Sequence, residues 1–242
     1  MQVLSQTSDV IIQDFKRTLP GYSFLKISRK FGQHMALQHD YSALLAAAPC
    51  ANKDALIRYL DAQLQNLWAD DYRKATPHPS EVLIINFHDD LHPTHTYSCL
   101  FDHASCAGLA DKQHDDRTVA FWGLSSPRPA DTRDKPYIAG LLRGVWSDRY
   151  DGDDRGHFIA HTSGGRLDVN LFPQEKTLNR GGEWRQMERY CSTHPKTFFF
   201  VRPLYHDDTW RPAFLEFGIY TTAEDAVRFW GQSFRNAKET ED

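Results

Sequence analysis

The sequence predicts an α+β fold in which a helical N-terminal region, residues 1–76, precedes a domain, residues 77–242, with a central and mostly antiparallel sheet. Apolar residues recur at helical spacing up to about residue 75, and short β-branched or aromatic runs separated by turn residues follow. The chain has 242 residues, 13% of them aromatic, so it can bury one large aromatic-rich core with a smaller helical front.

Two packing helices are predicted in the N-terminal region. Residues 55–72 place apolar side chains at three- and four-residue steps, which gives one apolar stripe with polar residues opposite. A shorter helix is predicted over residues 41–48, with Asp40 as its N-cap and Pro49 beyond its end.

Strands are predicted from residue 77 onward. Five short runs are rich in β-branched and aromatic residues and are bounded by turn signals, which is typical of strands. They cover residues 81–87, 118–122, 137–142, 197–202 and 214–220. The proline-containing segment 125–136 is predicted to be a surface loop.

The last element predicted is a helix over residues 223–236. Thr221 and Glu224 have the spacing of a capping box. A helix begun there would place four apolar side chains on one face, namely Ala226, Phe229, Trp230 and Phe234.

The charge of the chain argues against a protein that binds nucleic acid through a strongly basic surface. The net charge is -4 and the pI is near 6.3. Local contacts with phosphate remain available, because guanidinium groups bind phosphates bidentately. Five arginines crowd one stretch of the chain: Arg155, Arg166, Arg180, Arg185 and Arg189.

The first residues have no signal-peptide pattern, and no later run is long enough to span a bilayer, so we expect a protein that is cytoplasmic as synthesised and makes no membrane contact. Cysteines in such a compartment are expected to be free thiols. The chain has four of them: Cys50, Cys99, Cys106 and Cys191.

Three motifs between residues 154 and 189 carry the chemistry of a one-metal phosphodiesterase: D-R-G-H, N-L-F-P-Q and L-N-R-G-G-E-W-R-Q-M-E-R. A neutral imidazole can take the proton of an attacking water near pH 7, and His157 is the candidate. A Mg²⁺ or Mn²⁺ ion needs few protein ligands, and the amide oxygen of Asn179 is the candidate ligand. Glu188, further along the following helix, is a candidate acceptor for a metal-bound water.

These motifs resemble those of the DNA/RNA non-specific endonucleases, the ββα-metal nucleases that include sugar-non-specific nucleases and endonuclease G. The resemblance covers roughly residues 150–205. It implies a ββα-metal site in which His157 is the general base, Asn179 binds the metal, Asn170 supports the site and Glu188 comes from the following helix. Arg155, within D-R-G-H, is a further candidate catalytic residue.

Three features depart from the family pattern. One extra residue separates Asn179 from Trp184. The family has another arginine upstream of D-R-G-H, for which Arg143 and Arg149 compete. The acidic stretch of residues 148–154 is either a rim that attracts metal or a solvated turn.

A second series of side chains has spacing that suits zinc: His88, His92, His95, Cys99, His103 and Cys106. Pro93 interrupts a helix there, and no C-x-x-C pair is present, so structural zinc is not expected.

The sequence therefore predicts a metal-dependent endonuclease that cuts DNA, RNA or both with little sequence preference. The alternatives are a catalytically silent binding or scaffold module with the same fold, and a sequence-specific HNH-like nuclease. Because such an activity endangers its own cell, the resemblance also suggests a bacterial toxin or defence effector. It would be held by an inhibitor (immunity) protein or an activating protein, and delivery to another cell is one form of this hypothesis.

Overall fold

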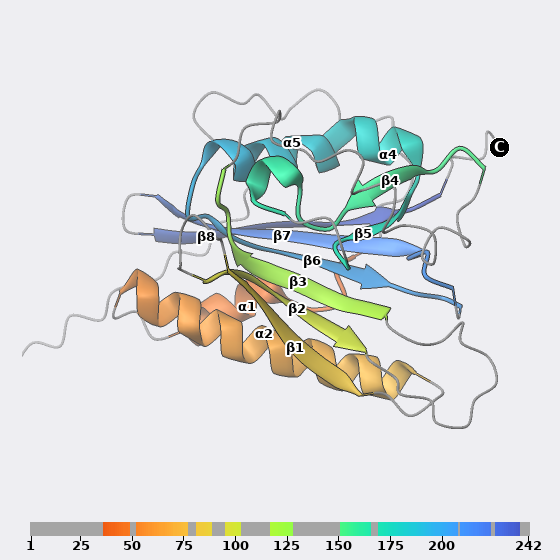
Figure 1. The fold of residues 1–242 in the computed structure, drawn as a ribbon. Helices are drawn as coiled ribbons and strands as arrows, with labels where there is room; N and C mark the ends of the chain where they lie inside the picture. Colours follow the sequence, from red (N-terminus) through yellow and green to blue (C-terminus); the bar gives the residue numbers. More distant parts are fainter. Residues whose placement is uncertain are drawn as a thin grey trace, which may run out of the picture.

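The computed structural model describes residues 36–48, 52–76, 81–88, 95–102, 117–127, 151–165, 169–207, 209–223 and 226–237 (Figure 1). A six-stranded sheet lies at its centre, in the order β1-β2-β3-β6-β7-β8, and every neighbouring pair is antiparallel. Its strands are β1 (Val82–His88), β2 (His95–Asp102), β3 (Arg117–Leu124), β6 (Phe198–Leu204), β7 (Phe214–Ala223) and β8 (Ala226–Arg235). This architecture confirms the α+β class and the antiparallel central sheet.

Each face of the sheet is covered by a different part of the chain (Figure 1). On one face lie α1 (Tyr41–Ala46) and α2 (Lys53–Ala75). On the other lie the hairpin of β4 (Asp154–His157) and β5 (Leu171–Gln174), followed by α4 (Lys176–Arg180) and α5 (Gly182–Thr193). These site-bearing elements all fall between β3 and β6, which are neighbours in the sheet.

Burial on both faces explains why the central strands lack polar alternation. In β6, Phe198 and Phe200 pack under the helices, whereas Phe199 and Val201 pack under the hairpin and α5. A strand with two covered faces is apolar at successive positions. The run of three phenylalanines in β6 is therefore a central strand.

The predicted N-terminal helices are confirmed. The Asp40 carboxylate accepts hydrogen bonds from the backbone N–H groups of Ser42 and Ala43, so it is the N-cap of α1 as expected. Trp122 of β3 donates to Asp61 of α2 at 2.6 Å and attaches that helix to the sheet. The proposed division at residues 76 and 77 stays a prediction. No helix within the described ranges combines the length and apolarity needed to cross a bilayer.

Four predicted strands, residues 81–87, 118–122, 197–202 and 214–220, are confirmed as β1, β3, β6 and β7. The predicted strand 137–142 and most of the loop 125–136 lie outside the described residues. Cys99 and Cys191 are free and buried, as expected, and Cys50 and Cys106 also lie outside the described residues.

The predicted C-terminal helix over residues 223–236 is wrong, because this segment forms β8 and pairs along its whole length with β7. Phe229 packs on the helical face and Phe234 on the other, so the apolar residues occupy two faces and not one helical stripe. Gly231, opposite Gly218, is a residue that disfavours helix. Pairing along the β7 edge outweighs the local capping-box signal.

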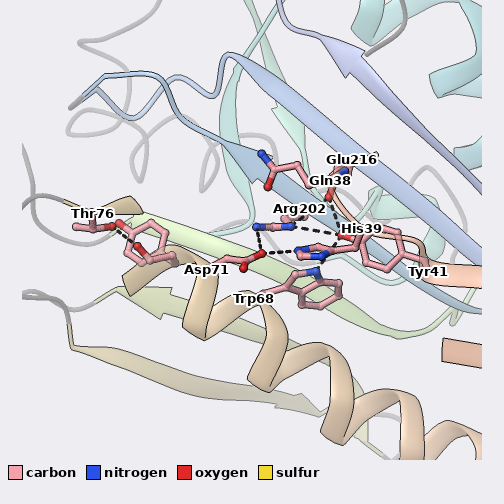
Figure 2. Close-up of polar contacts among 9 residues, drawn as sticks. Gln38, His39, Tyr41, Trp68, Asp71, Thr76, Arg202 and Glu216 are labelled. Carbon is pink, nitrogen blue, oxygen red and sulfur yellow. Dashed lines mark hydrogen bonds and ion pairs between the residues drawn. The ribbon is translucent and has the colours of Figure 1, made fainter. Parts of the chain in front are cut away.

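A buried ionic network holds the helical layer to the sheet (Figure 2). Arg202 of β6 and Glu216 of β7 are register partners, 4% and 0% exposed. The Arg202 guanidinium donates to Glu216 at 3.4 Å and to Asp71 of α2 at 2.9 Å. The Tyr41 hydroxyl of α1 donates to Glu216 at 2.6 Å. The two buried charges of the sheet thus have partners on the helices, Arg202 on α2 and Glu216 on α1.

Further contacts complete this network (Figure 2). His39 Nε2 lies 2.5 Å from the Asp71 carboxylate, and the Trp68 indole donates to the Tyr41 hydroxyl at 3.1 Å. The backbone N–H of Gln38 donates to Glu216 at 2.5 Å. Burial, with Glu216 beside it, raises the pKa of Tyr41, so its hydroxyl stays protonated and keeps donating.

Candidate active site

His157 lies at the end of β4, opposite Leu171 of β5. The chain after it is fixed by Asn170, which is fully buried. The Asn170 side chain accepts from the Ile159 backbone N–H at 2.7 Å and donates to the Ile159 carbonyl at 2.8 Å. This paired contact resembles a strand ladder, and it holds the backbone two residues beyond His157.

The glycine of D-R-G-H is required by packing. A Cβ atom at Gly156 would lie 2.3 Å from Oε1 of Gln174, a side chain on the neighbouring strand. Beyond it, Phe158 and Phe172 stack with centroids 4.2 Å apart, and Phe158 also stacks on Phe121 of the central sheet. These contacts fix the hairpin against the sheet. Because side chains alternate along a strand, His157 shares a face of β4 with Arg155, although His157 is only partly exposed and its Nε2 atom is buried.

The start of the hairpin is anchored by a buried ion pair. The Arg211 guanidinium donates two hydrogen bonds to the Asp153 carboxylate, at 2.7 and 2.9 Å. It also donates to the backbone carbonyl of Asn236, whose own side chain donates to the Pro173 carbonyl at 3.0 Å. This cluster ties both strands of the hairpin to the end of β8.

Asp154 joins the hairpin to α4. The Asn179 side chain donates through Nδ2 to Oδ2 of Asp154 at 3.0 Å. Arg180 donates to both carboxylate oxygens of Asp154 at 2.6 Å. The hydrogen bond from Arg180 lowers the pKa of Asp154 and outweighs the opposing effect of burial. Asp153 and Asp154 are therefore ion-paired, so for these two residues the acidic stretch is neither a metal-attracting rim nor a solvated turn.

The extra residue before Trp184 is accommodated between two helices. Asn179 lies in the short helix α4, and α5 begins after Gly181. Gly182 has φ +64, in the left-handed region, and nothing lies within 4 Å of the position of its Cβ atom. The Gly181-Gly182 pair thus separates the helix of Asn179 from the helix of Glu188.

We expect Gly182→Ala to lower the free energy of unfolding by about 1–2 kcal/mol, the cost of a left-handed backbone for a residue with a side chain. Gly181→Ala is the matched control, because Gly181 is extended and its added methyl group would meet only the Thr177 carbonyl at an ordinary 3.5 Å. Urea denaturation of both variants measures the difference. Equal midpoints would contradict the assignment of strain to Gly182.

Glu188 lies on the buried face of α5 and is 6% exposed, together with Trp184, Met187 and Cys191. Its carboxylate accepts a hydrogen bond from Arg185, which is 54% exposed on its side chain. Burial, with Glu188 nearby, raises the pKa of the Cys191 thiol, so this thiol is not a reactive thiolate. Glu188 is therefore a buried, charge-paired carboxylate and not a solvated helix residue.

The predicted site residues come together to different degrees. Asn170 holds the backbone beyond His157, and Asn179 contacts the first residue of the same strand, about 10 Å away along β4. Glu188 follows on α5, and Arg155, Arg185 and Arg189 are exposed. Arg143, Arg149 and Arg166 lie outside the described residues.

Asp154, Gln174 and the Asp153–Arg211 pair have structural roles that the sequence did not predict. Asp154 and Gln174 stand inside the quoted motifs, so the motif spacing was an available signal for them. Of the series whose spacing would suit zinc, His92, His103 and Cys106 lie outside the described residues, as do the side chains of His88 and His95.

Residues 116–221 match the family model described as DNA/RNA non-specific endonuclease. This part of the chain is similar to a DNA/RNA non-specific endonuclease domain. The matched range contains β4, β5, α4 and α5, and with them all five predicted site residues. α1 and α2 lie outside it. This match supports nuclease activity, with nucleic acid as the class of substrate.

One solved structure similar to the chain is an extracellular endonuclease. It is 12% identical, the match covers 67% of this chain and 82% of that chain, and the TM-score is 0.30. No curated protein matches the chain.

Proposed function

We propose that this protein is a Mg²⁺- or Mn²⁺-dependent endonuclease that hydrolyses phosphodiester bonds of DNA, RNA or both with little sequence preference. The observation that supports this most is the placement of two motif side chains around one short strand. His157 ends β4 and is held there through Asn170, and Asn179 is held against Asp154 where β4 begins.

The residues present fit a hard divalent cation. Asn179 offers an amide oxygen and Glu188 a carboxylate, which are oxygen donors of the kind that Mg²⁺ and Mn²⁺ take. Asn179 would hold the ion directly, and Glu188 through a bound water. When bound, such an ion stabilises negative charge on the phosphoryl oxygens and on the departing oxygen.

The chain's own residues supply the remaining functions. His157 accepts the proton of the attacking water, for which a neutral imidazole is suited near pH 7. Arg155, exposed on the same face of β4, binds the phosphate. Asn170 positions His157 through the backbone of Ile159 and does not contact the substrate.

Removing the metal tests this proposal. We expect EDTA to abolish the degradation of unrelated plasmids and of RNA, and added Mg²⁺ or Mn²⁺ to restore it. Asn179→Ala should stay inactive at the restoring concentration. Asn66→Ala is the control, because Asn66 is an exposed asparagine of α2, on the opposite face of the sheet.

The outcomes separate the alternatives. Cleavage in EDTA would refute metal dependence. Discrete fragments from one recognition sequence would favour the HNH-like nuclease, and binding of nucleic acid without cleavage would favour the silent module.

We also propose that the activity is controlled by an inhibitor (immunity) protein or an activating protein, as in a toxin or defence effector that is cytoplasmic as synthesised or delivered to another cell. The physical ground is that a nuclease of low specificity degrades the nucleic acid of its own cell. Expression in the native host followed by co-purification tests this. Co-purification of a stable second protein supports the proposal. A chain that purifies alone, is active and does not harm the host cell contradicts it.

A further inference from the structure

We infer that Asp154 is a positioning residue that fixes the orientation of the Asn179 carboxamide, so that Oδ1, and not Nδ2, is presented to the divalent cation. This inference rests on the proposed metal site. Only the oxygen of a carboxamide can bind a cation, and the group has two orientations related by rotation of its terminal torsion. A ligand that samples both orientations binds more weakly.

The Asp154 carboxylate selects one orientation. An ionised carboxylate accepts hydrogen bonds and donates none, so it pairs with Nδ2 of Asn179, at 3.0 Å. The rotated carboxamide would place Oδ1 against Oδ2 of Asp154, two acceptors with no proton between them. The observed contact therefore leaves Oδ1 as the atom that Asp154 does not engage.

The two partners of this contact are held to different degrees. Asp154 pairs with Gln174 across the hairpin, and its neighbour Asp153 is anchored by Arg211. Asn179, by contrast, belongs to the five-residue helix α4. A side chain fixed on the hairpin thus orients a side chain on a short helix.

Arg180 restricts Asp154 to this positioning role. Its guanidinium donates to both carboxylate oxygens at 2.6 Å, and Oδ2 also accepts from Asn179. The Asp154 carboxylate thus accepts three hydrogen bonds, two from Arg180 and one from Asn179, and its charge is paired with the Arg180 guanidinium. Asp154 therefore acts on the metal through Asn179 and not as a ligand.

The test measures Mn²⁺ affinity of the full chain by electron paramagnetic resonance of free Mn²⁺. We expect Asp154→Ala to weaken binding by about 10–100-fold, the usual effect of removing a residue that orients a metal ligand. Saturating Mn²⁺ should then restore most of the activity. Asp151→Ala is the matched control, because Asp151 is an exposed carboxylate three residues before Asp154 in the same segment.

Two further variants separate orientation from charge. Asp154→Asn keeps an acceptor oxygen at the same place and loses the charge, whereas Asp154→Glu keeps the charge and displaces the oxygens by one methylene. If Asp154 orients Asn179, Asp154→Glu loses more Mn²⁺ affinity than Asp154→Asn. If Asp154 acts only through its charge, Asp154→Asn loses more, and that result overturns the inference. This comparison stands even where Asp154→Ala does not fold.

Failure of the inference differs from failure of the proposed function. Unchanged Mn²⁺ binding in Asn179→Ala would remove the proposed metal site itself. Loss of binding in Asn179→Ala with unchanged binding in Asp154→Ala overturns only the positioning role.

Discussion

Replacing His157 with alanine is expected to lower the rate of plasmid and RNA cleavage by about 10²- to 10⁴-fold, the range contributed by a positioned general base. The methyl group of alanine cannot accept the proton of the attacking water. The hairpin should persist, because Asn170 holds it through the Ile159 backbone and Phe158 through its stacked ring, and neither contact involves the imidazole.

Initial rates at saturating Mg²⁺, with thermal unfolding of the same preparation, check this prediction. His206→Ala is the control, since His206 is an exposed histidine on the chain after β6. Full cleavage by a folded His157→Ala protein would remove the general base from the proposal. A loss that accompanies unfolding would give His157 a structural role.

Arg202→Ala is expected to lower the free energy of unfolding by about 3–5 kcal/mol, because it leaves Glu216 charged, 0% exposed and without its cationic partner. Asp71 loses its shortest contact with an arginine in the same variant. The transition midpoint in urea should fall accordingly. The effect arises on the face of the sheet opposite the site, so cleavage below the transition should be preserved.

Arg73→Ala is the matched control for Arg202→Ala. Arg73 also pairs with an aspartate, Asp70 at 3.4 Å, but the two side chains are 50% and 64% exposed. Pairs in water contribute little to stability, so the free energy of unfolding should change by less than about 1 kcal/mol. Similar effects of the two substitutions would show that burial of the network adds nothing.

Local patterns predicted the elements whose signals lie within a few residues. The apolar stripe of α2, the Asp40 cap and the aromatic runs of β3, β6 and β7 are of this kind. The short strands β4 and β5 were implied by the motifs and not by periodicity, because four residues are too few to show an alternation.

β8 shows where local patterns fail. Its apolar residues serve two different cores, and a spacing that places them on two faces of a strand also fits one face of a helix. The identity of β8 was decided by pairing with β7. Local patterns also fail at the candidate site, where Arg211, the partner of Asp153, lies 58 residues further along the chain. A partner at that distance leaves no periodic trace in the sequence.

The network on the helical face has a consequence for the order of assembly. The hydrogen bond from Tyr41 to Glu216 cannot form until Glu216, 175 residues later in the chain, has been synthesised. At a translation rate of about 5–20 residues per second, that wait lasts roughly 9 to 35 s. During this time α1 and α2 have no finished sheet on which to dock. The motifs of residues 154–189 are also synthesised before β6, β7 and β8, the strands that complete the sheet beneath them. The sheet that supports the site is therefore completed late in synthesis, when β7 and β8 have emerged from the ribosome.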